Sequence, residues 1–227
     1  MKRPLPKPWT HFDLLETFRS AKGCALCELE FRDVRHYLDY LLYENVNDGG
    51  VRSGLVRSRG YCHRHAHLLL TFQDGLGTAI LYEDQVKLLL EFLETVPGLS
   101  GKPPSKKTET AWNRHESCPA CRMQDQSRDR LIAALLNGLP EPQMRNALEA
   151  GPGLCVPHLL LVLDGTTDKE TKHHLTELHR KKYSDLLADL KEHIRKHDYL
   201  AGKEGFGKEH DAWIRAVNMM VGMKEVF

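Results

Sequence analysis

The sequence lacks an excess of charge, a membrane-length apolar run and an apolar N-terminal segment. Its 32 Lys and Arg residues balance 31 Asp and Glu residues, so the global basic surface of a dedicated nucleic-acid binder is not expected. The longest near-apolar run, Leu154 to Leu163, has ten residues, whereas a membrane span needs about 20. The first residues, MKRPLPKPWTHF, lack the apolar core and the cleavage site of a secretory signal. We therefore expect a cytoplasmic protein with no membrane partner, and we favour a protein partner over nucleic acid.

Common catalytic motifs and strand patterns are absent as well. The sequence contains no GxSxG, P-loop or GxGxxG motif, so it does not favour an enzyme. Almost no window shows the period-two alternation of β-branched residues that is typical of strands. Several segments instead carry apolar residues at helical spacing, as Phe31, Val34 and Leu38 do after the first CxxC motif. The predicted fold is all-α.

The six cysteines form a repeated pattern. Each half of the chain has a CxxC pair followed by a CxxH pair, in which Cys62 precedes His65 and Cys155 precedes His158. The offset between the halves is 94 residues for the CxxC pairs and 93 residues for the CxxH pairs. Such regularity predicts an internal duplication. In a cytosolic chain, cysteines at these spacings are more often metal ligands than a disulfide framework.

The spacing predicts two metal sites, each made within one copy of the repeat. Residues i and i+3 at a helix start face the same way, so each CxxH pair can complete a Cys3His set with a CxxC pair. We expect two Zn²⁺ ions with structural roles, because four protein ligands leave no open position for water. The expected ligands are Cys24, Cys27, Cys62 and His65 in site 1, and Cys118, Cys121, Cys155 and His158 in site 2.

Other functions of these residues stay open at this point. The same ligands suit iron-sulfur clusters, which would make a redox or sensing protein. A weaker alternative is a metal-dependent hydrolase at site 1, with His63 or His67 as acid/base or as auxiliary ligand. Four arginines near the first CxxH pair are candidates for an anion contact: Arg52, Arg57, Arg59 and Arg64.

The helical spacing of apolar residues, together with the Gly and Pro residues that end helices, predicts two pseudo-repeats of about three helices each, packed together with a C-terminal helix. The expected parts are an N-terminal extension (1–19), the first CxxC...CxxH repeat (20–97), a linker (98–113), the second repeat (114–200) and the C-terminal helix (201–227). The C-terminal helix carries an apolar stripe, by which we expect it to dock on the repeats: Trp213, Val217, Met220 and Val221.

Several segments resemble a family of uncharacterised prokaryotic proteins with duplicated CxxC...CxxH motifs. The segments are GYCHRH, GLCVPH, YENVND, ILYED and DAWIRAVNMMVG, and the resemblance covers nearly the whole chain. It implies a helical fold and brings no established activity. The sequence therefore predicts a helical metal-binding protein that acts as an interaction or scaffold protein.

Overall fold

The computed structural model describes residues 9–95, 112, 116–198 and 204–227, and these residues form helices without any strand. The prediction of an all-α fold is confirmed. Within the described part of the chain, no helix is long and apolar enough to cross a membrane. The predicted linker, 98–113, lies outside the described residues except for Trp112.

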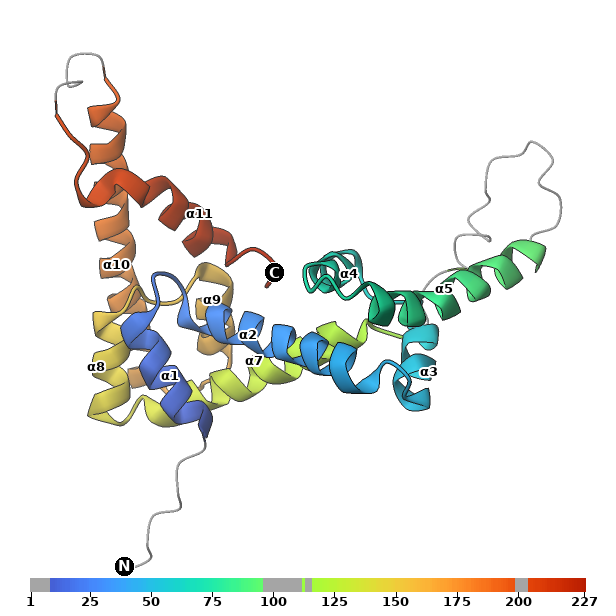
Figure 1. Ribbon diagram of the computed structural model, residues 1–227. Helices are drawn as coiled ribbons and strands as arrows, with labels where there is room; N and C mark the ends of the chain where they lie inside the picture. The colour runs from blue at the N-terminus through green and yellow to red at the C-terminus, as the bar shows by residue number, and fades with distance from the viewer. Residues whose placement is uncertain (1–8, 96–111, 113–115, 199–203) are drawn as a thin grey trace, which may run out of the picture. The chain divides into compact units, whose positions relative to one another are not determined.

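The order of the helices along the chain shows two similar series (Figure 1). The elements are α1 (Trp9–Ser20), α2 (Ala25–Tyr40), the π-helix η1 (Leu41–Asn45), α3 (Gly49–Arg57), α4 (His63–Leu70), α5 (Gly75–Thr95), α7 (Pro119–Gly138), α8 (Pro142–Ala150), α9 (Val156–Asp164), α10 (Lys169–Lys196), the 3-10 helix η3 (Lys208–Asp211) and α11 (Ala212–Val221). The first residues of α2, α3, α4 and α5 precede those of α7, α8, α9 and α10 by 93 or 94 positions. The helix starts thus follow the same offset as the cysteines.

The chain divides into two compact units that do not coincide with the two copies of the repeat. Unit 1 comprises Met1–Arg32 and Ser127–Phe227, and unit 2 comprises Asp33–Gln126. The boundaries fall inside α2 and α7, so both helices pass from one unit to the other. This division differs from the expected domains, which kept residues 20–97 and 114–200 apart.

Helix α1 belongs to the core of unit 1. Its residues Leu14, Leu15 and Phe18 are buried in the same apolar cluster as Leu135 and Leu148. The helix packs against α8, as Figure 1 shows. Residues 9–19 are therefore part of the core, whereas we expected 1–19 to form an N-terminal extension; residues 1–8 of that extension lie outside the described residues.

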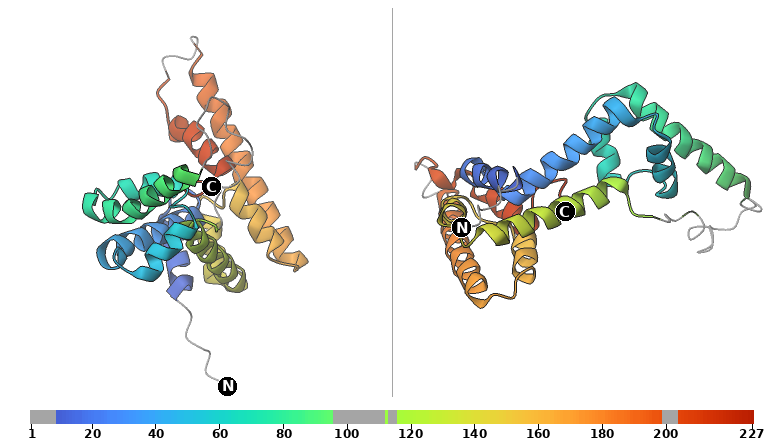
Figure 2. Two further views of the ribbon diagram at one scale, coloured as in Figure 1. Left: turned by 90° about the vertical axis from the view of Figure 1, so that its right-hand side faces the viewer. Right: turned by 90° about the horizontal axis from the view of Figure 1, so that it is seen from below.

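Helix α11 contacts α9 and α10 through a face other than the predicted stripe. Ala212 and Met219 are buried, whereas all four residues of the predicted stripe are at least 56% exposed: Trp213, Val217, Met220 and Val221. The two further views in Figure 2 also show α11 alongside α10. The expectation that this stripe makes the contact is wrong, because the apolar residues of α11 spread over more than one face.

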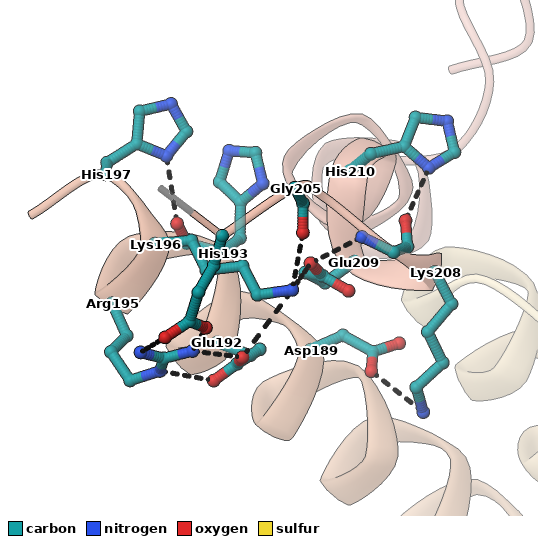
Figure 3. A network of polar contacts seen from close by, with 12 residues as sticks. Asp189, Glu192, His193, Arg195, Lys196, His197, Gly205, Lys208, Glu209 and His210 are labelled. Carbon is teal, nitrogen blue, oxygen red and sulfur yellow. Dashed lines mark hydrogen bonds and ion pairs between the residues drawn. The ribbon is translucent and has the colours of Figure 1, made fainter. Parts of the chain in front are cut away.

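Ion pairs join the C-terminal segment to α10 (Figure 3). Lys196 Nζ lies 2.7 Å from Glu209 Oε1, and the Glu209 side chain is almost fully buried. The Asp189 carboxylate forms ion pairs with Lys208 and Arg215, each at 3.1 Å. These contacts position η3 and α11 on the surface of α10.

In unit 2, α5 contacts α3 and η1. Leu55 and Leu81 are buried there, and the Arg52 guanidinium makes two hydrogen bonds of 2.6 Å to the Asp84 carboxylate. This ion pair joins α3 to α5, the helices before and after the chain segment that carries the first CxxH pair.

Candidate metal centres

Each CxxH pair lies at the start of a short helix, after a glycine with left-handed backbone. Gly60 has φ 81° and Gly153 has φ 95°, a region that residues with a Cβ rarely adopt. Two residues later, Cys62 and Cys155 are the N-cap residues of α4 and α9, with extended backbone at ψ 165° and 161°. The histidine three residues on therefore lies in the first helical turn, on the same side as the sulfur.

Each CxxC pair also lies at a helix start. Cys24 and Cys118 precede α2 and α7, and their carbonyl groups accept helical hydrogen bonds from Glu28 and Arg122 at 3.2 and 3.1 Å. The second cysteine of each pair is in the first turn of its helix. This geometry points the two sulfurs to one side, as a shared ion requires.

In unit 1, three sulfurs surround the Nδ1 atom of His158. Nδ1 lies 3.4 Å from the Sγ atoms of Cys24 and Cys27 and 3.2 Å from that of Cys155. The sulfurs of Cys27 and Cys155 are 3.6 Å apart. All four residues are buried.

The cluster in unit 2 has nearly the same dimensions. The Nδ1 atom of His65 lies 3.3 Å from the sulfur of Cys62, 3.4 Å from that of Cys121 and 3.6 Å from that of Cys118. The sulfurs of Cys62 and Cys121 are 3.7 Å apart. Cys62 and Cys121 are partly exposed.

The structure corrects the grouping of ligands that we expected. The eight residues are those named from the sequence, but each cluster combines the CxxC pair of one copy with the CxxH pair of the other. The clusters are Cys24, Cys27, Cys155 and His158 in unit 1, and Cys62, His65, Cys118 and Cys121 in unit 2. A 16-residue helix such as α2 is about 24 Å long. It carries the chain away from its own CxxC turn before the CxxH turn of that copy is reached.

The dimensions of both clusters suit a single tetrahedral ion. With Zn–S about 2.3 Å and Zn–N about 2.0 Å, two sulfurs are about 3.8 Å apart and a sulfur and a nitrogen about 3.5 Å apart. The four ligand atoms of each cluster lie within 4.8 Å of one another. Two Cys3His groups that could hold metal ions are therefore present.

In each cluster the cysteine at the helix N-cap has a lowered thiol pKa. Hydrogen bonds from Cys24 and Cys27 lower the pKa of Cys155 to about 4, and the backbone N–H of His158 contributes. For Cys62, burial acts in the opposite direction, but the N–H of His65 and hydrogen bonds within the cluster lower the pKa overall. Thiolates, which bind metal ions, form readily at these two positions.

Behind the unit 1 cluster, Glu30 and Arg128 hold the histidine. The Nε2 atom of His158 lies 2.6 Å from Glu30 Oε1, and Arg128 donates two hydrogen bonds of 3.0 and 2.9 Å to the same carboxylate. Burial alone would lower the pKa of His158, but its bonds to Cys24 and Glu30 raise the pKa to about 9. A carboxylate bonded to the second ring nitrogen orients a histidine ligand and increases its basicity.

The histidine of the unit 2 cluster has a different neighbour. Burial, reinforced by the charge of Arg64, lowers the pKa of His65 to about 4, and the side chain of Gln124 opposes this only in part. Gln124 is an uncharged amide, so His65 lacks the charged partner that Glu30 gives to His158. The Gln124 Oε1 atom accepts a hydrogen bond of 2.8 Å from Arg64.

The residues predicted from the sequence did not include Glu30, Arg128 or Gln124. The repeat offset was the available signal, since Glu30 and Gln124 stand 94 positions apart, three residues after the second cysteine of each CxxC pair. Nothing in the sequence indicated that Glu30 would meet the histidine of the other copy. Arg128 has no arginine counterpart 94 positions earlier, where Val34 stands.

The other residues singled out from the sequence lie away from the ligand atoms or have partners of their own. His63 and His67 are exposed, with ring centroids 4.5 Å apart. They stand two positions from His65 on α4, so they face the opposite side of the helix. The arginines each have a partner within unit 2: Asp84 for Arg52, Glu116 for Arg57, the Trp112 ring for Arg59, and Gln124 for Arg64.

A pocket of about 440 Å³ adjoins the CxxC turn of unit 1. Its walls come from the turn before α2 and from α10 and α11, including Tyr183, Ile214 and Met219. Cys24 and Cys27 border it but are only 5% and 1% exposed. The pocket therefore reaches the turn and leaves the thiols covered.

The fold and the two clusters define a class of helical protein with duplicated Cys3His groups. The chain belongs to the Family of unknown function (DUF6062), which matches residues 9–226. It is similar to the "Uncharacterized 23.9 kDa protein in xynA 3'region" of Caldicellulosiruptor sp. (strain Rt8B.4), at 28% identity over 211 residues, 92% of this chain and 99% of that protein. No solved structure matches the chain significantly. The predicted membership of an uncharacterised prokaryotic family is confirmed.

Proposed function

We propose that the protein is a helical scaffold or interaction protein stabilised by two structural Zn²⁺ ions, one in each unit. The main support for this proposal is the clustering of all six cysteines. All six cysteines and two of the 13 histidines lie in two groups whose four ligand atoms are within 4.8 Å of one another. In each group the ion joins a turn from one copy of the repeat to a turn from the other.

The compactness of the clusters favours a single ion over an iron-sulfur cluster at the same residues. A cluster places several irons and bridging sulfides between its protein ligands, which spreads the ligand atoms apart. Here the contacts between ligand atoms are 3.2 to 3.6 Å in unit 1, close to the edges of one tetrahedron around zinc. Three thiolates and an imidazole also match the ligand preference of zinc.

The same arrangement favours a structural role over hydrolysis. Four protein ligands fill a tetrahedral shell, whereas a catalytic zinc keeps one position for water. His63 and His67, the acid/base candidates, are exposed residues of α4 on the side opposite His65. They are therefore not placed to exchange protons with a group on the ion.

Metal analysis of protein purified without a His-tag or added metal, under anaerobic conditions, tests the proposal. We expect about two zinc ions per chain and no visible absorption. A zinc chelator should then reduce the helical circular dichroism and the melting temperature, because ligation is coupled to folding. Iron with acid-labile sulfide would favour the redox alternative, and a chain that binds neither metal would refute the proposal.

The exposed face of α11 supports a role in binding a protein partner. Trp213, Val217 and Met220 are each more than half exposed on one helix, and aromatic and methionine side chains are enriched at protein interfaces. A double variant, Trp213→Ser with Val217→Ser, should keep its zinc and its melting temperature but lose a partner reconstituted from purified components. Trp9→Ser is the control, since Trp9 is 86% exposed on α1 of the same unit. Equal binding by the double variant would exclude this face.

A further inference from the structure

The two clusters have the same ligands but different surroundings. We propose that the unit 2 cluster is a metal-exchange site, from which Zn²⁺ passes to competing thiol or imidazole ligands, while the unit 1 cluster retains its ion. This inference rests on the proposed zinc binding. Beyond binding, it assigns a distinct function to the unit 2 ligands Cys62, His65, Cys118 and Cys121.

Access to the ligand atoms differs between the units. In unit 1, Cys155 and His158 have no exposed surface, and Cys24 and Cys27 are nearly covered. In unit 2, Cys62 and Cys121 are partly exposed. An incoming ligand therefore meets two partly exposed ligand residues at the unit 2 cluster and none at the unit 1 cluster.

The second difference is the group behind each histidine. A histidine that binds metal through Nδ1 carries its proton on Nε2, and that proton needs an acceptor. Glu30 supplies a charged acceptor for His158 at 2.6 Å. At the equivalent position, 94 residues later, stands Gln124, an uncharged amide that interacts with His65 but cannot supply the negative charge of a carboxylate. Partners of this kind typically change metal affinity by about 10- to 100-fold.

The third difference is the cover that the C-terminal segment gives to unit 1. The Met223 backbone N–H lies 3.4 Å from the sulfur of Cys27, where it donates a hydrogen bond. The Phe227 ring packs against the ring of His158, with centroids 4.9 Å apart, and Arg128 lies 4.9 Å from the centre of the same ring. Val226 beside it is buried. Removing the unit 1 ion therefore requires this segment to move.

The exchange itself is a ligand substitution without a redox change. The incoming thiol loses its proton and its sulfur binds zinc, while the thiolate of Cys62 or Cys121 leaves the ion and takes up a proton. Repetition of this step transfers the ion to the acceptor, and zinc remains Zn²⁺ throughout. The histidine lacking a charged partner is the weaker nitrogen ligand of the two clusters.

Timed alkylation during chelation tests the inference on the unmodified full-length protein. The protein loaded with two zinc ions is mixed with the chromogenic chelator 4-(2-pyridylazo)resorcinol, and samples are pulsed with N-ethylmaleimide and mapped by mass spectrometry. We expect two phases of one ion each, separated by tenfold or more in rate. Cys62, Cys118 and Cys121 should be alkylated in the fast phase, and Cys24, Cys27 and Cys155 only in the slow phase.

Reciprocal variants test the role of the group behind the histidine. Gln124→Glu places a carboxylate beside both His65 and Arg64, so it should slow the fast phase by about tenfold. Glu30→Gln should accelerate the slow phase by a similar factor and leave the fast phase unchanged. Because Glu30→Gln also removes the negative charge that pairs with Arg128, the unmodified protein and Gln124→Glu decide the result if that variant does not fold.

The outcomes separate this inference from the proposal on which it rests. A protein that binds no zinc refutes the proposed function itself. A protein that binds two ions but releases them in a single phase, or labels Cys24 and Cys27 first, keeps its zinc sites and refutes the exchange function. Earlier labelling of those two cysteines would mean that the pocket beside the CxxC turn admits the chelator.

Discussion

The sulfurs of Cys27 and Cys155 lie 3.6 Å apart, although 128 positions separate the two residues in the chain. They come from different copies of the repeat, so each compact unit needs both copies to complete its cluster. A single copy contains three cysteines and one histidine of the pattern, but they are divided between the two units. Each copy of the repeat therefore contributes two ligands to each unit, and neither copy forms a complete cluster by itself.

This pairing predicts which thiols lose protection when one ligand is removed. In Cys155→Ala, the unit 1 ion should be lost, so N-ethylmaleimide should alkylate Cys24 and Cys27 in the native protein. Cys118 and Cys121 should stay protected because their ion is bound in unit 2. Zinc content should fall from two ions to one per chain, and peptide mapping locates the modified cysteines.

The matched variant is Cys62→Ala, for which the expected pattern is reversed. Here Cys118 and Cys121 should become reactive while Cys24 and Cys27 stay protected. Pairing within each copy makes the opposite assignment for both variants. Alkylation of Cys118 in Cys155→Ala would therefore show that each CxxC pair shares its ion with the CxxH pair of the same copy.

The identity of the candidate ligands could be predicted from the sequence because the chemistry is local. A CxxC or CxxH spacing at a helix start brings two ligand atoms together whatever the rest of the chain does. Helical periodicity is local too: the spacing of Phe31, Val34 and Leu38 predicted a helix after the first CxxC motif, where α2 lies. The pairing of the turns, by contrast, depends on the direction and length of α2 and α7, which no spacing between cysteines encodes.

Burial was the second property that the sequence could not assign. The stripe of Trp213, Val217 and Met220 was expected to dock, and it is exposed. Leu14 and Phe18 were placed in an extension, and they are buried. An amphipathic pattern shows that a helix has an apolar face, but which face meets the core depends on neighbours that are distant in sequence.

The position of α1 predicts unequal costs for its two phenylalanines. Phe18 is 1% exposed in the unit 1 core and Phe12 is 52% exposed. Phe18→Ala should lower the free energy of unfolding by about 3 to 5 kcal/mol, as for other buried phenylalanines. Phe12→Ala should cost about 1 kcal/mol or less, since it leaves no cavity. Urea denaturation of the zinc-loaded protein measures the two losses, and equal losses would mean that α1 does not pack as described.

The glycines before the CxxH turns predict a graded effect. Gly60 and Gly153 both have positive φ, so alanine at either position should cost about 1 to 2 kcal/mol. At Gly153 a Cβ would also lie 2.7 Å from the Lys182 side chain, whereas at Gly60 the nearest atom is 3.7 Å away. We therefore expect Gly153→Ala to be the more damaging variant in thermal unfolding. Gly75→Ala is the control, because nothing lies within 4 Å of a Cβ there, and a loss as large as that of Gly60→Ala would contradict the argument.

The ion pair between Lys196 and Glu209 predicts a pH-dependent contribution to stability. The Lys196 ammonium, helped by the backbone N–H of Gly207, lowers the pKa of Glu209 from 4.5 to about 2. Because the pKa is lower in the folded state, the contribution is fully present above about pH 4.5 and is lost as the pH falls toward 2. The melting temperature of Glu209→Gln should therefore lie below that of the unmodified protein at pH 7, and the gap should narrow between pH 4.5 and pH 3. The control is Glu177→Gln, which removes an exposed ion pair with Arg180 on α10; its melting temperature should differ little from that of the unmodified protein at every pH. If the difference for Glu209→Gln stays constant with pH, the titration of Glu209 is not its cause.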